Sequence, residues 1–412
     1  MTKVLKMSRL KNSIISIKNR LINLLLNRKN EKNRLEIISQ GTQICFEDMP
    51  LKVHWTLTHA CNYRCSYCFG RNSSYKHDMC SLEDAETAIR YLAIANRPAY
   101  QVSLLGGEPT LHPALGEIIA LLSKHLGKRL EKISIITNGS FNEITIQKLL
   151  DVSSNICIEV KISVHFEFAD IEKLIQLVER MSDKISIVFL IMFHPDLQDK
   201  VADTVDKLCE LRKIYPFDLS MELIRGPENF TQYHKHYTEE QFKWARSVQE
   251  RFRQIDRESK VEKRPIPEEK GWTFVVKRKE KGLISEQENV SVEELDDLTG
   301  CCFRGMSCCV GTSVIDIMPD GTSRGLVCGL AADKYNIFQE NPFREGGIIR
   351  TIQCKKNKCT CNVDYRTPKF LDKAEADSFV RSCQLKQQKL TEDYISCYSL
   401  KGNYRGDIYT TN

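Results

Sequence analysis

The sequence has no long hydrophobic segment and no export signal. No apolar run approaches the roughly 18 residues that a membrane-spanning helix needs. The N-terminus also lacks a compact apolar segment followed by a small-residue cleavage site, so we expect a cytoplasmic protein rather than a secreted one. With 412 residues, 42% of them hydrophobic and 28% charged, the chain should form two or three modules with a sizeable core. This composition excludes collagen-like, wholly disordered and polytopic membrane proteins.

Acidic residues are nearly missing from the N-terminal segment. Residues 1–34 contain ten Lys or Arg and one acid, Glu31, which gives this segment a net charge of +9. The rest of the chain therefore sums to 6 − 9 = −3, and a general nucleic-acid-binding surface is not indicated. Apolar residues at helical spacing, from Leu10 to Leu25, predict a basic amphipathic helix within residues 1–48. Such a helix either lies on an anionic membrane surface or packs on the protein body.

From about residue 50, short β-rich segments alternate with helical ones. The expected strands are 51–58, 102–105, 133–137, 158–164, 185–193 and 217–223, and the expected helices are 81–95, 113–125, 144–150, 170–181 and 201–213. Because parallel neighbours need crossover helices, this alternation implies a parallel sheet. Six strands are fewer than the eight that close a full barrel, so we expect an open or partial barrel over residues 49–250. Its site should lie at the C-terminal ends of the strands.

The remaining chain divides by composition. Residues 251–300 are rich in charge and predict a linker followed by a hairpin that begins near residue 272. Residues 301–370 are rich in cysteine and contain a turn signal between strands at Met318 to Gly321. Residues 371–412 predict a helix and a polar tail.

Cysteine is abundant, at 17 residues. In a cytoplasmic chain, clustered cysteines more often bind metal or perform redox chemistry than form disulfides. Cys61, Cys65 and Cys68 form a CxxxCxxC motif directly after the first expected strand. Three thiolates on one loop can hold a [4Fe–4S] cluster and leave one iron open to a small molecule. The alternative is a zinc loop with a fourth ligand from a nearby histidine, His54, His59 or His77.

A second motif, Gly106-Gly107-Glu108-Pro109, ends the second expected strand. Glycines permit a close approach of the backbone to a ligand, and a carboxylate at a strand end can meet a ligand ammonium. Alone, this segment fits an ordinary turn between strand and helix. Together with the cysteine motif on the preceding strand, it predicts a single site.

The two motifs together resemble those of the radical S-adenosylmethionine (SAM) superfamily, over roughly residues 50–225. The resemblance implies an α/β fold, a partial (β/α)6 TIM-like barrel with a small cysteine-rich α+β C-terminal extension. It also implies a [4Fe–4S] cluster on Cys61, Cys65 and Cys68, with SAM at the open iron. The implied SAM contacts are Tyr67 at the adenine, Gly106, Gly107, Glu108 and Pro109 at the methionine amino group, and Thr137, Asn138 and Ser163 at the ribose and carboxylate.

The cysteine-rich module is similar to the twitch or SPASM-type extensions of these enzymes, which ligate auxiliary iron–sulfur clusters. The CxxC that a two-cluster extension would carry near Cys354 is missing. We therefore expect one auxiliary [4Fe–4S] cluster, with four ligands drawn from Cys308, Cys328, Cys354, Cys359 and Cys361. A zinc knuckle is the alternative, since four thiolates also suit zinc.

The resemblance implies an enzyme that cleaves SAM reductively to a 5′-deoxyadenosyl radical and abstracts a hydrogen from a substrate. The substrate would be a sugar-like or glycan precursor or a peptide, which is oxidised, epimerised or crosslinked; a peptide maturase specifically is an alternative. A non-enzymatic zinc or iron–sulfur regulator is the alternative of another class. We expect an external flavodoxin- or ferredoxin-like electron donor and no nucleic-acid partner. Peripheral membrane contact through residues 1–34 is one of the two interpretations of the basic helix. No catalytic residue is assigned; His165 is either a substrate contact or a core imidazole.

Overall fold

The computed structural model describes most of the chain. The described residues are 35–40, 45–68, 70, 78–226, 233, 236–267, 273–280, 283–291, 303–328, 335–356, 359 and 366–400. The helix expected within residues 1–34, the histidine His77, the cysteine Cys361 and the polar tail 401–412 lie outside the described residues.

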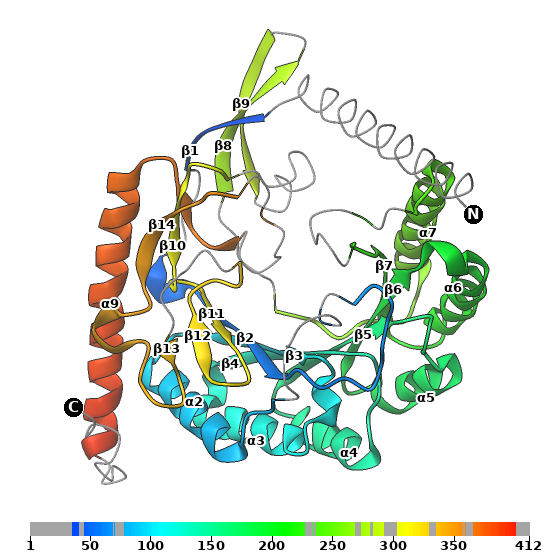
Figure 1. Ribbon diagram of the computed structural model, residues 1–412, viewed down its shortest axis with the longest axis horizontal. Coiled ribbons are helices and arrows are strands. Elements are labelled where there is room, and N and C mark those ends of the chain that lie inside the picture. Colours follow the sequence, from blue (N-terminus) through cyan, green and yellow to red (C-terminus); the bar gives the residue numbers. More distant parts are fainter. Residues whose placement is uncertain are drawn as a thin grey trace, which may run out of the picture.

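Six parallel strands form the centre of the molecule (Figure 1). They pair in chain order as β2 (Leu51–Thr58), β3 (Tyr100–Gly106), β4 (Leu130–Thr137), β5 (Cys157–Val164), β6 (Ser186–Phe193) and β7 (Phe217–Leu223). The connecting helices are α2 (Leu82–Ile94), α3 (Leu115–Leu126), α4 (Glu143–Val152), α5 (Ile171–Met181) and α6 (Gln198–Arg212), and α7 (Glu239–Glu258) follows the last strand. These helices lie along the outer side of the curved sheet. The predicted partial barrel is confirmed.

Local signals in the sequence begin several of these helices. Ser81, Asn142 and Asp170 precede α2, α4 and α5, and each side chain accepts a hydrogen bond from the backbone N–H three residues later. Such caps satisfy donors that have no partner within the helix. These caps fix the residue at which each helix begins, just after the loop that follows a strand.

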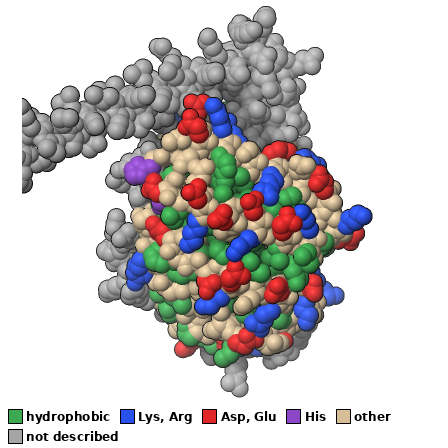
Figure 2. All heavy atoms as spheres, turned by 90° about the vertical axis from the view of Figure 1, so that its right-hand side faces the viewer, with side chains coloured by type: hydrophobic (Ala, Val, Ile, Leu, Met, Phe, Trp, Pro, Cys, Tyr) green, Lys and Arg blue, Asp and Glu red, His purple; other side chains and the backbone are tan. Residues whose placement is uncertain are grey.

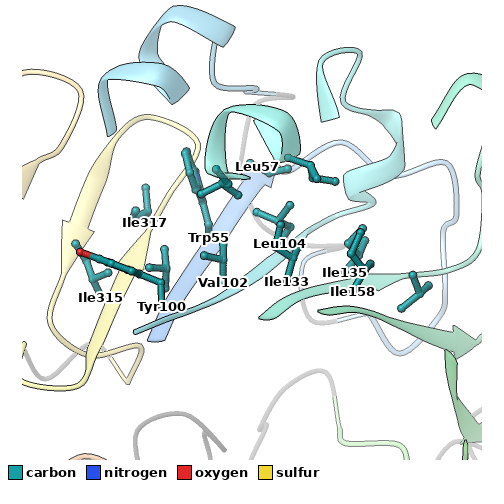
Figure 3. Close-up of a cluster of buried hydrophobic side chains, with 14 of the residues drawn as sticks. Trp55, Leu57, Tyr100, Val102, Leu104, Ile133, Ile135, Ile158, Ile315 and Ile317 are labelled. Carbon is teal, nitrogen blue, oxygen red and sulfur yellow. The ribbon is translucent and has the colours of Figure 1, made fainter. Parts of the chain in front are cut away.

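Apolar and polar side chains alternate along the strands, which gives the sheet an apolar outer face and a polar inner face. Trp55, Leu104 and Ile133 are fully buried and pack side by side beneath the helices (Figure 3). Because successive side chains of a strand point to opposite faces, Ser134 and Glu159 lie on the concave side of the sheet. The concave side of the partial barrel therefore carries polar and charged groups.

The cysteine-rich region, which the sequence predicted as one module over residues 301–370, is divided between two sheets. One part of it extends the barrel sheet: β11 (Val314–Ile317) pairs in parallel with β2, and β12 (Thr322–Arg324) and β13 (Tyr335–Asn336) follow, which gives nine strands. Asp316 stabilises the pairing of β11 with β2. Its carboxylate oxygens lie 2.9 Å from Nδ1 of His54 and 2.7 Å from the Arg324 guanidinium. Short strands with unpaired edges are stabilised when a larger sheet pairs with them.

The other part of the cysteine-rich region forms a small antiparallel sheet. Its strands are β10 (Ser307–Val310), β14 (Arg350–Gln353) and β15 (Lys369–Phe370), with β10 in the middle. The long helix α9 (Lys373–Leu400) contacts β10 and β14, and Figure 1 shows it along one side of the molecule. The predicted C-terminal helix is thus confirmed.

A third sheet contains the predicted hairpin, β8 (Thr273–Glu280) and β9 (Leu283–Ser291). Its third strand is β1 (Leu35–Gln40), which pairs with β8. Residues 35–40 are therefore a strand, although the sequence predicted a helical segment over residues 1–48. Helix α7 also continues to Glu258, beyond the predicted boundary at residue 250. Short 3-10 helices complete the structure: η1 (Phe46–Asp48), η3 (Pro109–Leu111), η4 (Gly127–Arg129), η5 (Pro195–Leu197) and η6 (Arg344–Gly346).

Basic and acidic side chains alternate on the face of the molecule shown in Figure 2, with small apolar areas between them. This face therefore offers no surface of one charge sign. In the part of the chain that the structure describes, no helix is long and apolar enough to span a membrane.

One buried arginine connects three separate segments. Arg97 is fully buried, and its guanidinium donates to the carbonyls of Met49 and Thr312, both at 2.9 Å. The guanidinium carbon also lies 3.9 Å from the centre of the Phe46 ring. Arg97 therefore joins the segment before β2, the α2–β3 loop and the β10–β11 loop.

Replacing Arg97 should destabilise the whole protein. We expect Arg97→Leu to lower the free energy of unfolding by about 3 kcal/mol, because two buried carbonyls lose their donor. Arg90→Ala is the matched control: Arg90 forms an exposed pair with Glu86, and its loss should cost less than about 1 kcal/mol. Urea unfolding of both variants measures the difference. Equal midpoints for the two variants would contradict this role of Arg97.

Candidate functional site

The three motif cysteines lie on the loop that follows β2, at the C-terminal ends of the parallel strands. Cys65 is buried, Cys61 is half-buried and Cys68 is exposed. A turn holds the loop, in which the N–H of Cys68 donates to the carbonyl of Cys65 at 3.1 Å. Burial raises the pKa of the Cys65 thiol to about 12, with a further contribution from the charges of Glu167, Cys68 and Cys61. The thiols are thus close enough to influence one another.

Two glycines bring the next loop against the cysteine loop. The N–H of Gly107 donates to the carbonyl of Thr58 at 2.8 Å, and the N–H of Glu108 donates to the carbonyl of Ala60 at 2.8 Å. A Cβ on Gly106 would lie 2.3 Å from the Thr58 oxygen, and one on Gly107 would lie 2.3 Å from the Ala60 oxygen. The structure thus shows that these glycines permit the close approach of two protein loops, where the sequence suggested the approach of a ligand.

The carboxylate of Glu108 is turned into the protein. Glu108 is 1% exposed, and its oxygens accept from the hydroxyl of Thr137 and the N–H of Asn138, both at 2.6 Å. The N–H and the hydroxyl of Thr110 add contacts at 3.0 and 2.7 Å. Glu108 therefore joins the ends of β3 and β4. Its expected contact with the methionine amino group stays a prediction.

The end of β4 is also tied to the cysteine loop. The side-chain amide of Asn138 donates to Oδ1 of Asn62 at 2.8 Å, and the Asn62 amide donates to the hydroxyl of Ser140 at 2.8 Å. The hydroxyl of Thr137 accepts from the N–H of Gly139 at 2.9 Å. Thr137, Asn138 and the glycine turn are therefore brought together beside the cysteines, as the sequence predicted. Their contacts with SAM are not tested by this geometry.

Residues after β5 and β6 hold the other side of the cysteine loop. The hydroxyl of Tyr67 and Nδ1 of His165 share a hydrogen bond of 2.8 Å. The N–H of Ser66 donates to Glu167 at 2.7 Å, and the other Glu167 oxygen lies 3.7 Å from Nε2 of His194. Glu167 and His194 were not predicted from the sequence. The feature that could have identified them is their position just after parallel strands, where functional side chains are often found.

His165 is uncharged at neutral pH. Burial lowers the pKa of His165 to about 4, although the charge of Glu167 opposes this shift. The imidazole is thus a neutral hydrogen-bonding partner of Tyr67, which itself packs with Cys65 and Ile224. Ser163 lies two residues earlier, partly exposed near the end of β5 and opposite Leu190 of β6. Tyr67 thus contacts a residue that follows β5, and Ser163 lies near the end of the same strand.

The three thiols of the cysteine loop suit an iron–sulfur cluster. Among the described residues, no three His, Cys, Asp or Glu side chains converge where one metal ion could bind. In an iron–sulfur cubane each thiolate binds a different iron, so the three thiols need not converge on one point. Nδ1 of His54, a histidine considered for zinc, is 2.9 Å from Asp316 on β11. The loop therefore suits a cluster with three protein thiolates.

A second group of cysteines lies on the small sheet. Cys308 lies in β10, and Cys354, whose N–H donates to the carbonyl of Met306 at 2.8 Å, follows β14. The neighbouring thiol of Cys354 and burial raise the pKa of Cys308, with a smaller contribution from Cys359. Cys328 packs against Val310, Leu326 and Ile352. Cys309 points to the other face of β10, toward Cys383 of α9, and burial raises the pKa of both thiols. Three of the five predicted ligands are thus grouped, and Cys328 lies next to the same strands.

Removing the charge of Glu108 should destabilise the site. In Glu108→Gln an amide NH₂ would face the donors of Thr137, Asn138 or Thr110, so we expect a loss of about 2 kcal/mol in the free energy of unfolding. The control is Glu83→Gln, on the exposed first turn of α2, with a change below about 0.5 kcal/mol. Chemical unfolding of the full chain gives both values. An unchanged Glu108→Gln midpoint would show that these contacts do not stabilise the fold.

Comparison with known proteins places this site in a family. Residues 55–208 match the family model of the radical SAM superfamily. An S-adenosylmethionine-dependent nucleotide dehydratase of Psychrobacter lutiphocae is 36% identical over 102 residues, which cover 22% of this chain and 33% of the relative. A GTP 3′,8-cyclase of Paracoccus denitrificans is 29% identical over 87 residues, or 21% of this chain and 25% of the relative. The chain thus spans about a third or less of these curated relatives.

Two solved structures are similar in outline. Streptococcus suis SuiB bound to S-adenosylmethionine is 17% identical, with a TM-score of 0.44 over 71% of this chain and 64% of that one. Native anSMEcpe with bound AdoMet is 15% identical, with a TM-score of 0.48 over 84% of this chain and all of that one. The family match itself covers the cysteine loop, the glycine turn and the strand ends that form the site. On this match, residues 55–208 form a radical SAM domain.

Proposed function

We propose that this protein is an enzyme that cleaves SAM reductively to a 5′-deoxyadenosyl radical, which abstracts a hydrogen atom from a polar substrate. The observation that carries the proposal is the pairing of the cysteine loop with the Gly106–Gly107 turn at the C-terminal ends of parallel strands. In such folds, ligands bind at this end of the sheet. The family match covers the same residues.

Three cysteines would hold the [4Fe–4S] cluster: Cys61, Cys65 and Cys68. When bound, the reduced cluster supplies the electron that cleaves the sulfonium bond of SAM. The backbone of Gly106 and Gly107 forms one group beside this loop, and Tyr67 of the loop with Ser163 of β5 forms the other. SAM between these two groups would agree with the contacts that the family resemblance implies.

The protein groups around the site hold it in place, and one of them, His165, is uncharged near neutral pH. Glu108 fixes Thr137 and Asn138, which keeps the end of β4 against the cysteine loop. Burial lowers the pKa of His165 to about 4, so this imidazole stays neutral as it holds Tyr67. A fixed arrangement of this kind reduces the reorganisation that a reaction requires.

The concave side of the sheet supports a polar substrate. Nζ of Lys161 lies 3.2 Å from Glu159, and Nζ of Lys132 lies 3.7 Å from the same carboxylate. The hydroxyl of Ser134 donates to Glu159 at 2.7 Å. Two ammonium groups with one carboxylate favour a substrate that forms hydrogen bonds, such as a sugar-like or glycan precursor or a peptide. A peptide maturase remains the narrower alternative.

An auxiliary [4Fe–4S] cluster on the small sheet is part of the proposal. Cys308, Cys354 and Cys359 are grouped there, and Cys361 or Cys328 would complete the four ligands. An external flavodoxin- or ferredoxin-like protein would deliver the electron. Contact of residues 1–34 with a membrane surface stays a prediction, since these residues lie outside the described part of the chain.

Cysteine variants separate the two clusters. After anoxic reconstitution, we expect about eight irons per chain in the unmodified protein. Cys65→Ala should hold about four irons and form no 5′-deoxyadenosine with dithionite and SAM. Cys354→Ala should also hold about four irons and still cleave SAM. Cys209→Ala, which changes a buried cysteine in α6, should keep both the iron and the activity.

Other outcomes decide against parts of the proposal. About four irons in the unmodified protein, with SAM cleavage, would remove the auxiliary cluster and keep the enzyme. Zinc in place of iron, without cleavage, would support the non-enzymatic regulator. Full activity of Cys65→Ala would contradict the role of the cysteine loop.

A further inference from the structure

Charges of opposite sign lie beside the two cysteine sites. We propose that Lys369 raises the reduction potential of the auxiliary cluster while Glu167 lowers that of the cluster on Cys61, Cys65 and Cys68. Each charge thus shifts the potential of the cluster beside it. This inference rests on the proposed function, because it requires both clusters.

Lys369 is placed next to the auxiliary cysteines by the register of the small sheet. Lys369 of β15 pairs directly with Cys308 of β10. Directly opposite residues of an antiparallel pair share one face, with Cβ atoms about 5 Å apart. The Lys369 charge therefore acts on both Cys308 and Cys354.

The ammonium of Lys369 is shielded from water. Lys369 is 1% exposed, and its Nζ donates to the carbonyl of Thr367 at 2.8 Å and lies 4.8 Å from the centre of the Phe303 ring. Burying an ammonium is costly unless negative charge lies near it. A cluster held by thiolates supplies negative charge at this place.

Glu167 touches the other cysteine site. Its carboxylate accepts the N–H of Ser66, the residue between Cys65 and Tyr67, at 2.7 Å. Its charge also acts on Cys65. The Glu167 side chain is 21% exposed, so its interaction with the loop is only partly screened by solvent.

The sign of each effect follows from electrostatics. Reduction adds one negative charge to a cluster, which a nearby cation stabilises and a nearby anion destabilises. Both effects are stronger away from water, where the dielectric constant is low. Lys369 therefore favours the reduced auxiliary cluster, and Glu167 favours the oxidised form of the first cluster.

The test is an anoxic redox titration of the reconstituted full chain without SAM, followed by electron paramagnetic resonance. The signals of the two clusters are assigned with Cys65→Ala and Cys354→Ala. The unmodified protein supplies the reference potential of each cluster.

Charge variants then test each residue. Lys369→Met should lower the reduction equilibrium constant of the auxiliary cluster about tenfold, which is 59 mV for one electron, and leave the other cluster unchanged. Glu167→Gln should raise that of the first cluster by a similar factor. Lys356→Met is the matched control, because Lys356 is exposed near Cys354 and should change the constant less than about threefold.

The outcomes distinguish this inference from the proposed function. Iron well below eight per chain in the unmodified protein would remove the clusters and hence the proposed function. Full iron with unchanged potentials in Lys369→Met and Glu167→Gln would overturn the charge effect and leave the proposed function intact. If Lys369→Met loses iron, Lys369→Arg keeps the charge and should preserve the potential; a large shift in that variant would count against the inference.

Discussion

The close contact between two backbone segments is the constraint on which the site depends. The carbonyls of Thr58 and Ala60 accept hydrogen bonds from Gly107 and Glu108, and neither glycine of the turn has room for a Cβ. This contact fixes the start of the cysteine loop relative to β3. Because the loop continues directly to Cys61, the positions of the thiols follow from it. The cysteine motif and the glycine motif thus lie on the two sides of one backbone contact.

Residues at the ends of β4 and β5 stabilise this contact between the two loops. Glu108 connects this contact to β4 by hydrogen bonds with Thr137 and Asn138. Glu167, which follows β5, accepts a hydrogen bond from Ser66 of the cysteine loop. The parallel sheet makes this arrangement possible, since it gathers the ends of all its strands at one edge. The nine-stranded sheet also links the site to the cysteine-rich region, because β11 pairs with β2, the strand that leads into the cysteine loop. The two proposed clusters therefore belong to one continuous framework.

The sequence predicted features that depend on local signals. The six parallel strands are buried apolar runs with helices between them, and the CxxxCxxC and Gly106-Gly107-Glu108 motifs lie within a few residues of strand ends. Features that depend on distant contacts were missed. The junction of His54 with Asp316 joins residues 262 positions apart, and no pattern in either segment indicates it. The inward turn of Glu108 and the strand at 35–40 were missed for the same reason, since each is set by its partners.

The most direct test of the contact between the glycine turn and the cysteine loop is the iron content of Gly107→Ala after anoxic reconstitution, with Gly116→Ala as the control. An added Cβ at Gly107 meets backbone oxygens at 2.3 and 2.6 Å, whereas one at Gly116 meets the flexible side chain of Lys148. We predict that Gly107→Ala loses the cluster on the cysteine loop, which lowers iron to about half, and that Gly116→Ala keeps all of its iron. Full iron with normal SAM cleavage in Gly107→Ala would contradict the claim that this contact positions the cluster.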